Sequence, residues 1–397
     1  MGTKGRRRVV WFLLAMVVIL VITLRIYDRV IHEPIPNIPA VLHDDLSGYL
    51  QSHRQDPSDY LLGKFEEHDI VLLGEFHRVK HEVEFVRDLI PRLWENGIHN
   101  LGIEFGSYDL QELSDSIVSA EQYDPDAARE MMFRWDPNWG YVEYLELYRA
   151  AWEVNSKLEP GQPRFRIINL DYAPDYTVLQ ENMTPDLWRQ VWHKGDRDRY
   201  MADVVKEAVL DKHEKALVYC GRNHSFSKYK QPIFDQNTQK VSTYSDWRLG
   251  NLLRHEIGDK VMTVLFHSPW NDASSSRKNY PLGGAIDRVM LSSDNQPAGF
   301  DTHGTPFGGL TDKLSDYSRG YPELTLADVC DGYLFVKPIT EFKGCTVDPQ
   351  IVTSSNFKEA MTRYPTMFGR KILRWAWLYR WSMQHDANMK SRFRHLM

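Results

Sequence analysis

Six short apolar runs, separated by longer segments of helical periodicity, constrain the fold of this chain more than any other feature of its sequence. The runs are Ile70 to Leu73, Leu101 to Phe105, Phe165 to Leu170, Ala216 to Cys220, Val261 to Phe266 and Tyr333 to Val336. Between them, residues 80–97 carry apolar side chains at helical spacing and end at Gly97, a residue type that often follows a helix. This alternation predicts an α/β fold with a mainly parallel central sheet and helices on both faces.

An apolar segment near the N-terminus stands apart from this pattern. Residues 9–24 contain no charged side chain, and Arg6, Arg7 and Arg8 precede them. As a helix the segment is ~24 Å long, slightly short of the ~30 Å hydrocarbon core of a bilayer. It is either a cleaved signal peptide or a retained anchor. Because no small-x-small cleavage site follows it, we expect a single N-terminal transmembrane helix within residues 1–29. The basic residues place the main domain outside the cytoplasm, in the periplasm or the extracellular space.

The rest of the chain divides by composition. Residues 30–45 contain three prolines and predict a linker, and residues 46–345 hold the apolar runs and predict the α/β domain. Within that domain, residues 271–330 are rich in Gly, Ser, Asp and Pro and predict long loops over the site. Residues 346–397 predict a basic, aromatic, helical tail, which either lies on a membrane surface or packs against the domain.

Charge and cysteine content narrow the function classes. The net charge of -6 argues against a nucleic-acid partner, which normally requires a basic surface. Cys220 lies inside an apolar run and predicts a buried free thiol. Cys330 and Cys345 either pair or are two unrelated thiols, and the spacing of the three cysteines matches no zinc ribbon or redox motif.

Polar side chains follow five of the apolar runs, at the point where each run ends. In chain order they are Glu75 and His77, Glu104, Asp171, Arg222 and His224, and His267. Because ligands of open α/β sheets bind beyond the carboxyl ends of the strands, we expect these side chains to surround one site. The set suits either a divalent metal ion or a metal-free acid–base site, in which His77 activates water and a carboxylate orients it.

Several of these residues have alternative interpretations. Glu104 stands among apolar neighbours, and a buried carboxylate requires a cation or a proton as its partner. Asp171 suits either catalysis or the start of a turn, and a lone histidine such as His267 is more often a hydrogen-bonded structural residue. His81 and Glu82, at the start of the helix that follows, suit a solvated helix face.

Three of these strand ends carry motifs that resemble a known superfamily. "GEFH" (74–77), "GIEF" (102–105) and "GRNH" (221–224) occur in this order over roughly residues 65–270. The pattern resembles the superfamily that joins erythromycin esterases, ChaN-like haem-binding lipoproteins and Tiki metalloproteases, and the first motif is most similar to the ChaN-like type. The chain departs from the lipoprotein pattern because it has no lipobox cysteine near its N-terminus.

The resemblance implies that Glu75, His77, Glu104 and His224 form the core of the site. The Tiki branch implies a divalent metal ion and peptide hydrolysis. The esterase branch implies water activated by histidine, with metal unnecessary. The ChaN branch implies haem binding, with His77 or a neighbouring imidazole as the iron ligand.

The resulting hypothesis is a membrane-anchored extracytoplasmic hydrolase that acts on a small-molecule or peptide substrate, through an ester or peptide bond. In it His77, Glu104 and His224 hold a divalent metal ion, and Glu75 is the general base. Asp171 is a further catalytic residue, and Arg222 stabilises an oxyanion or anchors an acidic substrate. The alternative is a haem- or iron-binding protein without catalysis, with His77 and His224 at the cofactor. The sequence predicts membrane contact through the N-terminal helix and leaves the oligomeric state open.

Overall fold

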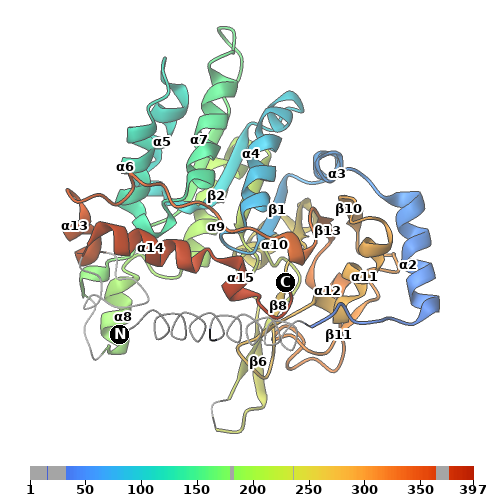
Figure 1. Cartoon of the computed structure of the whole chain (residues 1–397). Coiled ribbons are helices and arrows are strands. Elements are labelled where there is room, and N and C mark those ends of the chain that lie inside the picture. The colour runs from blue at the N-terminus through green and yellow to red at the C-terminus, as the bar shows by residue number, and fades with distance from the viewer. Residues whose placement is uncertain (1–15, 17–32, 179–182, 236, 364–374) are drawn as a thin grey trace, which may run out of the picture.

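Seven strands form one central sheet in the part of the chain that the structure describes. The computed structural model describes residues 16, 33–178, 183–235, 237–363 and 375–397. The strand order is β10-β13-β7-β1-β4-β2-β3 (Figure 1). The strands are β1 (Ile70–Glu75), β2 (Asn100–Ser107), β3 (Arg166–Asp171), β4 (Ala216–Gly221), β7 (Val261–Phe266), β10 (Ala298–Asp301) and β13 (Gly332–Phe335).

Six of these strands run parallel, and each coincides with one of the apolar runs. β1 pairs with β4 and β7, β2 pairs with β3 and β4, and β13 pairs with β7, all in parallel. Only β10, at one edge, is antiparallel to its neighbour β13. The predicted α/β fold with a mainly parallel central sheet is therefore confirmed.

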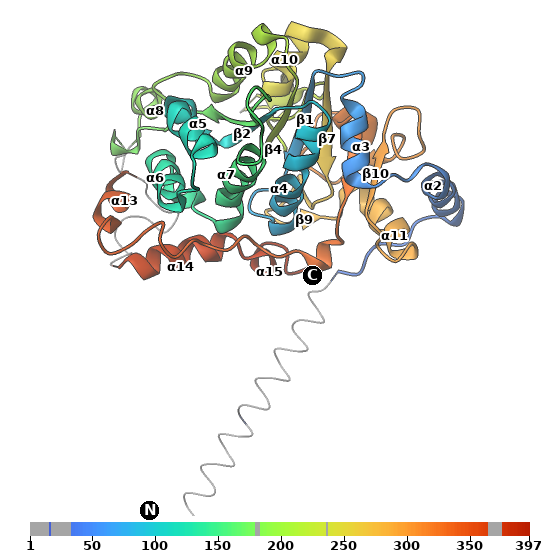
Figure 2. The same cartoon turned by 90° about the horizontal axis from the view of Figure 1, so that it is seen from above.

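Helices cover both faces of the sheet, because alternate residues of each strand point to opposite sides. On β1, Val71 and Leu73 join the core formed with α4 to α7, whereas Ile70 and Leu72 join the core formed with α9 and α10. Figure 2 shows α4 to α7 on one side of the strands and α9 and α10 on the other. A further core, under α2, α11 and α12, covers β10 and β13.

The helices named by these labels are α2 (Ala40–His53), α3 (Pro57–Lys64), α4 (Lys80–Glu95), α5 (Gln111–Ser119), α6 (Pro125–Trp135), α7 (Val142–Asn155), α8 (Pro185–Val191), α9 (Arg197–Ala208), α10 (Leu249–Ile257), α11 (Ala285–Ser292), α12 (Leu326–Val329), α13 (Phe357–Arg363), α14 (Ala376–Asp386) and α15 (Met389–Arg392). Three two-stranded sheets lie outside the central one: β5 (Gln231–Phe234) with β6 (Val241–Ser245), β8 (Trp270–Asn271) with β9 (Lys278–Asn279), and β11 (Thr311–Asp312) with β12 (Leu324–Thr325).

Residues 271–330 are more ordered than the predicted long loops. They contain α11, α12, the edge strand β10 and several two-residue strands. The strand β10 has the sequence AGFD, too short and too poor in large apolar side chains to be recognised from periodicity. The predicted linker, residues 30–45, also ends early, because α2 begins at Ala40.

The C-terminal segment packs into the same core as the sheet. Tyr379 and Met383 of α14 are buried in the cluster that includes Val71 and Tyr141, and the Tyr141 hydroxyl donates to the Met383 carbonyl at 3.0 Å. Among the described residues, no helix is long and apolar enough to cross a membrane. Residues 9–24, apart from Met16, lie outside the described part, so the transmembrane helix stays a prediction.

The cysteines are unpaired. Cys220, Cys330 and Cys345 are free and buried, and Cys330 and Cys345 belong to different cores, so the interpretation as two unrelated thiols is the one that fits.

We therefore expect a thiol reagent to titrate three thiols per chain in denatured protein prepared without reductant, and far fewer in the native protein, because the core shields all three. A reduced sample is the control and gives the same count. A single reactive thiol in the unreduced, denatured sample would show that the other two are paired.

Candidate active site

The carboxyl ends of four central strands lie at one edge of the sheet, as the parallel topology requires. Glu75, the last residue of β1, is aligned with Gly221, the last residue of β4. Ser107 of β2 is aligned with Asp171 of β3. The side chains that follow the apolar runs therefore converge on one edge, as expected for ligand sites of α/β sheets.

A hydrogen bond between Glu75 and His77 lies at the centre of this edge. Glu75 Oε1 is 2.7 Å from His77 Nδ1, and the Glu75 side chain has no exposed surface. The Tyr144 hydroxyl donates to Glu75 at 2.9 Å, and the Tyr219 hydroxyl donates to its Oε2. Because three donors already occupy its oxygens, Glu75 holds and orients the imidazole. It is not placed to act as the expected general base.

His77 lies against the end of β4 and exposes its second nitrogen. A Cβ atom on Gly221 would be 2.8 Å from His77 Nε2 and 2.4 Å from Cε1, so a glycine is required for this close approach. Phe105 and Trp139 contact the ring edge-on, with centroids 5.7 and 5.0 Å away. His77 is 34% exposed, and within the described chain its Nε2 has no hydrogen-bond partner. Nε2 is therefore the ring nitrogen that the Glu75 bond leaves without a partner among the described residues.

A second cluster of charges adjoins this edge and joins Glu104 to His224. His224 Nε2 is 3.3 Å from Glu104 Oε1, and His224 Nδ1 is 2.6 Å from Asp198 Oδ1. Arg197 donates to Glu104 at 3.3 Å and, through two of its nitrogens, to Asp171. The cluster therefore links three carboxylates through two cationic side chains.

The charges of this cluster balance one another. Burial opposes a charged imidazole, but the carboxylates of Glu104 and Asp198 outweigh it and raise the pKa of His224 to about 10. Burial likewise opposes ionisation of Glu104, but the charges of His224, His77 and Arg197 hold the pKa of this carboxyl well below its usual range. At neutral pH, Glu104 is thus an anion whose cationic partners come from the protein itself.

This balance does not fit the divalent metal ion expected at His77, Glu104 and His224. Both ring nitrogens of His224 already face carboxylates, so neither is directed at an open coordination position. Arg197 brings a further positive charge to Glu104. Over the described ranges of the chain, no group of three or more His, Cys, Asp or Glu side chains is placed to hold a metal ion. The expected metal ligands are better described as an internal ion-pair network.

A cavity of about 180 Å³ lies at the ends of β1 and β4. Its walls include Glu75, His77, Arg222, His224, Lys278 and Arg392. Arg222, expected near a substrate anion, is in this wall and donates to Ser268 Oγ at 3.1 Å.

Asp171, expected among the catalytic residues, is not part of this wall. Its carboxylate is buried and serves instead as the counter-charge of Arg197.

Three other residues lie away from the cavity. His267 is a structural histidine, with Nε2 3.0 Å from Asp287 Oδ1 and Nδ1 3.0 Å from the Tyr333 hydroxyl. The solvated position predicted for His81 and Glu82 is wrong, since both are buried. His81 packs against Phe342 of the C-terminal segment, with centroids 4.6 Å apart. Glu82 accepts the Phe76 N–H at 2.9 Å.

Sequence reasoning missed several residues of the site. Tyr144 and Tyr219 hold Glu75, but in the sequence they belong to a helix face and an apolar strand. Arg197 lies in the charged segment "KGDRD", where nothing distinguishes it from a solvated arginine. Lys278 and Arg392 come from segments far from the motifs. No local signal identifies these five residues, because their roles depend on tertiary packing.

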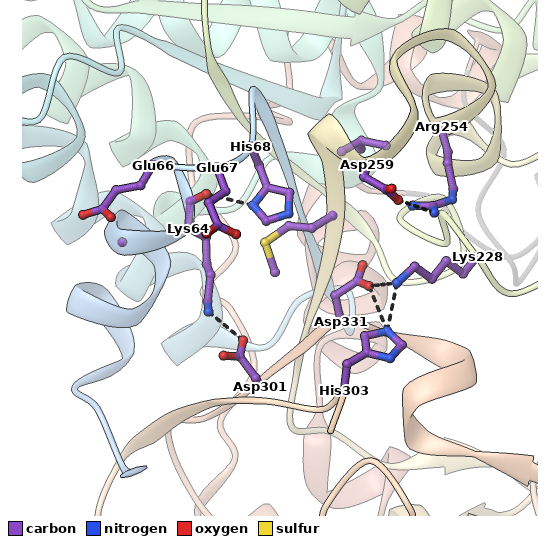
Figure 3. A pocket seen from close by; sticks show the side chains of 13 residues that line it. Lys64, Glu66, Glu67, His68, Lys228, Arg254, Asp259, Asp301, His303 and Asp331 are labelled. Atoms are coloured by element: carbon purple, nitrogen blue, oxygen red, sulfur yellow. Dashed lines mark hydrogen bonds and ion pairs between the residues drawn. The ribbon is translucent and has the colours of Figure 1, made fainter. Parts of the chain in front are cut away.

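A larger groove lies at the opposite edge of the sheet, where the strands begin (Figure 3). Its volume is about 550 Å³, and most of its charged side chains pair with one another. Asp331 pairs with Lys228 and His303, and Lys64 pairs with Asp301. Because most of its charges are paired internally and it faces the amino ends of the strands, this groove is the weaker candidate despite its size.

No family model and no curated protein matches the chain. Among solved structures, the chain is similar to a succinoglycan biosynthesis protein, with a TM-score of 0.53 and 11% identity over 78% of this chain and 100% of that chain. It is also similar to a mutant of the erythromycin esterase EreC in its open conformation, with a TM-score of 0.43 and 11% identity over 74% of this chain and 95% of that chain.

A structure of cofacial heme binding to ChaN of Campylobacter jejuni matches with a TM-score of 0.35 and 14% identity over 53% of this chain and 86% of that chain. The one likeness described here with a TM-score above 0.5, to the succinoglycan biosynthesis protein, shows a shared fold. At these identities the likeness is one of fold, and the chemistry has to come from the site itself.

The charge of His224 predicts a dependence of stability on pH. Its pKa is about 10 in the folded chain and about 6.5 in an unfolded one, so its contribution is complete below pH ~6.5, declines as pH rises and is absent above pH ~10. We expect His224→Gln to lower the free energy of unfolding by about 3–5 kcal/mol near pH ~6, because it leaves buried carboxylates without their partner. The loss becomes much smaller near pH ~10.

Denaturant unfolding of both proteins at several pH values measures this difference. His255→Gln removes an exposed histidine that pairs with Asp246 and is the control, with an expected change below about 0.5 kcal/mol. A His224→Gln deficit that stays constant from pH ~6 to pH ~10 would contradict a charged His224.

Proposed function

We propose that this protein is a hydrolase in which His77, oriented by Glu75, is the general base that activates water. The observation that carries the proposal is the 2.7 Å bond from His77 Nδ1 to the buried Glu75, with Nε2 left free at a cavity. In the neutral imidazole, a proton on Nδ1 leaves the lone pair on Nε2. The pair thus has the geometry of the base and its orienting carboxylate in hydrolytic sites.

The reaction follows from these positions. Nε2 of His77 takes a proton from water as the water oxygen attacks the electrophilic centre of an ester or peptide bond, and the imidazolium returns a proton to the leaving group. Glu75 stabilises the imidazolium that forms between the two transfers. Arg222 and Lys278, in the wall of the same cavity, supply positive charge that attracts an anionic substrate to His77.

The network of Glu104 and His224 supports the base without joining the reaction. Glu104 Oε2 accepts the Gly221 N–H at 2.7 Å, so it fixes the end of β4 against which the His77 ring rests. The proposal needs no divalent ion, since the nitrogens of His224 are used for ion pairs.

Haem is the weaker alternative for this site. The ChaN structure concerns heme binding to that protein. Here the cavity beside His77 is about 180 Å³, below the ~300 Å³ at which pockets for drug-sized ligands begin. A porphyrin would require the walls to separate, whereas a water molecule and one small group would not.

We also propose that the hydrolase is tethered to a membrane through residues 9–24, with the α/β domain outside the cytoplasm. Glu33, just after that segment, donates its N–H to the His395 carbonyl at 2.6 Å, so the chain enters beside the C-terminus. Figure 2 shows α14 and α15 along this side of the molecule. Trp375, Trp377 and Trp381 are each more than half exposed there, and exposed tryptophans suit a membrane interface.

The test of catalysis is His77→Gln assayed with p-nitrophenyl acetate, a simple activated ester. We expect the rate to fall by about 10²–10⁴-fold, the contribution of a positioned base, while the fold is kept because the His77 side chain is partly exposed. Addition of a chelator leaves the wild-type rate unchanged.

His303→Gln is the matched control, because His303 is exposed and lies in the opposite groove. A His77→Gln rate equal to that of wild type would refute the role of His77 as base. A rate abolished by the chelator would refute the metal-free reaction, and a Soret shift on adding haem that is lost in His77→Gln would favour haem binding.

A further inference from the structure

The cavity at the sheet edge contains three cationic side chains that no carboxylate neutralises. Arg222, Lys278 and Arg392 all line it, and their charged groups lie 5.7, 5.8 and 4.4 Å from the centroid of the Phe76 ring. They come from the end of β4, from β9 and from α15. In the described part of the chain, no carboxylate oxygen lies within the 4.0 Å ion-pair distance of their charged nitrogens.

The acidic residues near the cavity have other partners. Glu75 is held by His77 and two tyrosine hydroxyls. Burial and the charge of Glu75 raise the pKa of Glu82 well above its usual range, and Glu82 accepts the Phe76 N–H. Asp316 accepts from Asn271 Nδ2 at 2.9 Å. Asp316 acts on Lys278 and Asp386 acts on Arg392 only from beyond ion-pair distance, so no described carboxylate pairs with the cations of the cavity.

This concentration of charge is unfavourable for the protein alone. Burial, together with the charges of Arg222 and Arg392, lowers the pKa of Lys278. Arg222 is only 6% exposed, and its Nε is buried without a hydrogen-bond partner. By contrast, the buried charges of Glu104 and His224 pair with each other and with further charged side chains. An unpaired cationic cluster in a cavity is typical of a site whose counter-charge is the ligand.

We propose that Arg222, Lys278 and Arg392 bind a phosphate group, and that the substrate of the hydrolase is an ester that carries this phosphate. The inference rests on the proposed function, since His77 lines the same cavity. A phosphate monoester carries a charge of about -1.5 to -2 and three acceptor oxygens, which match three donors from separate directions. A carboxylate carries one charge, which a single forked arginine satisfies. The cavity of about 180 Å³ holds one compact anion beside His77 rather than a long acidic chain.

Calorimetric titration of inorganic phosphate into the full chain tests this assignment, with acetate as the comparison anion. The titration is repeated with His77→Gln, Lys278→Met and Arg277→Gln. Lys278→Met removes one cation at a half-buried position and avoids the buried Arg222, and circular dichroism checks that it folds. Arg277 is next in the chain but exposed and paired with Glu33, so Arg277→Gln is the matched control.

We expect phosphate to bind wild type, His77→Gln and Arg277→Gln with similar affinity, and folded Lys278→Met about tenfold or more weakly. Acetate binds much more weakly than phosphate. Equal phosphate affinity of folded Lys278→Met and wild type, or equal affinity for acetate and phosphate, overturns the assignment. If phosphate binding requires the cations but no ester is hydrolysed, the phosphate assignment stands and the proposed function is wrong. If ester hydrolysis depends on His77 but is not inhibited by phosphate, the proposed function stands and the phosphate assignment is wrong.

Soluble dihexanoyl phosphatidic acid, with dihexanoyl phosphatidylcholine as its control, identifies the source of the phosphate, because the proposed anchor would bind any vesicle. Binding that requires phosphatidic acid and is lost in Lys278→Met assigns a lipid phosphate. Binding of free phosphate but not of dihexanoyl phosphatidic acid assigns a soluble phosphate ester. Both results support the phosphate site, and failure of both probes to bind overturns it.

Discussion

The bond between Glu75 and His77 is the interaction on which the site depends. A carboxylate with no exposed surface loses its hydration, and this loss must be offset by hydrogen bonds. Tyr144, Tyr219 and His77 supply them. The same bonds fix the direction of the imidazole, so the hydrogen bonds that stabilise the buried Glu75 also determine which nitrogen of His77 faces the cavity.

The parallel sheet brings this pair to the other functional groups. Since β1 and β4 are in register, the end of one strand supplies Glu75 and the end of the other supplies Gly221, which leaves room for the ring. Glu104 on β2 then holds the Gly221 N–H and is itself neutralised by His224 and Arg197. The edge therefore contains a balanced network on one side of His77 and an uncompensated cationic cavity on the other.

Much of this arrangement is predictable from sequence. The part that is not depends on contacts between segments that are far apart in the chain. Apolar runs identify the parallel strands, and parallel strands bring Glu75, His77, Glu104 and His224 to one edge without further information. Whether Glu104 takes a metal ion or a protein cation depends on Arg197, which only the folded chain brings to it. The cation cluster likewise requires segments that are far apart in sequence, and β10 and the buried positions of His81 and Glu82 arise from tertiary packing.

The tautomer of His77 tests the central claim most directly, because it reports on the Glu75 bond without requiring a substrate. Nitrogen NMR of protein labelled at histidine, with His77→Gln to assign the signal, distinguishes the two ring nitrogens. The account predicts that neutral His77 carries its proton on Nδ1 and leaves Nε2 bare, and that Glu75→Gln abolishes this preference. A proton on Nε2 in the wild type, or a His77 signal that Glu75→Gln does not change, would contradict it.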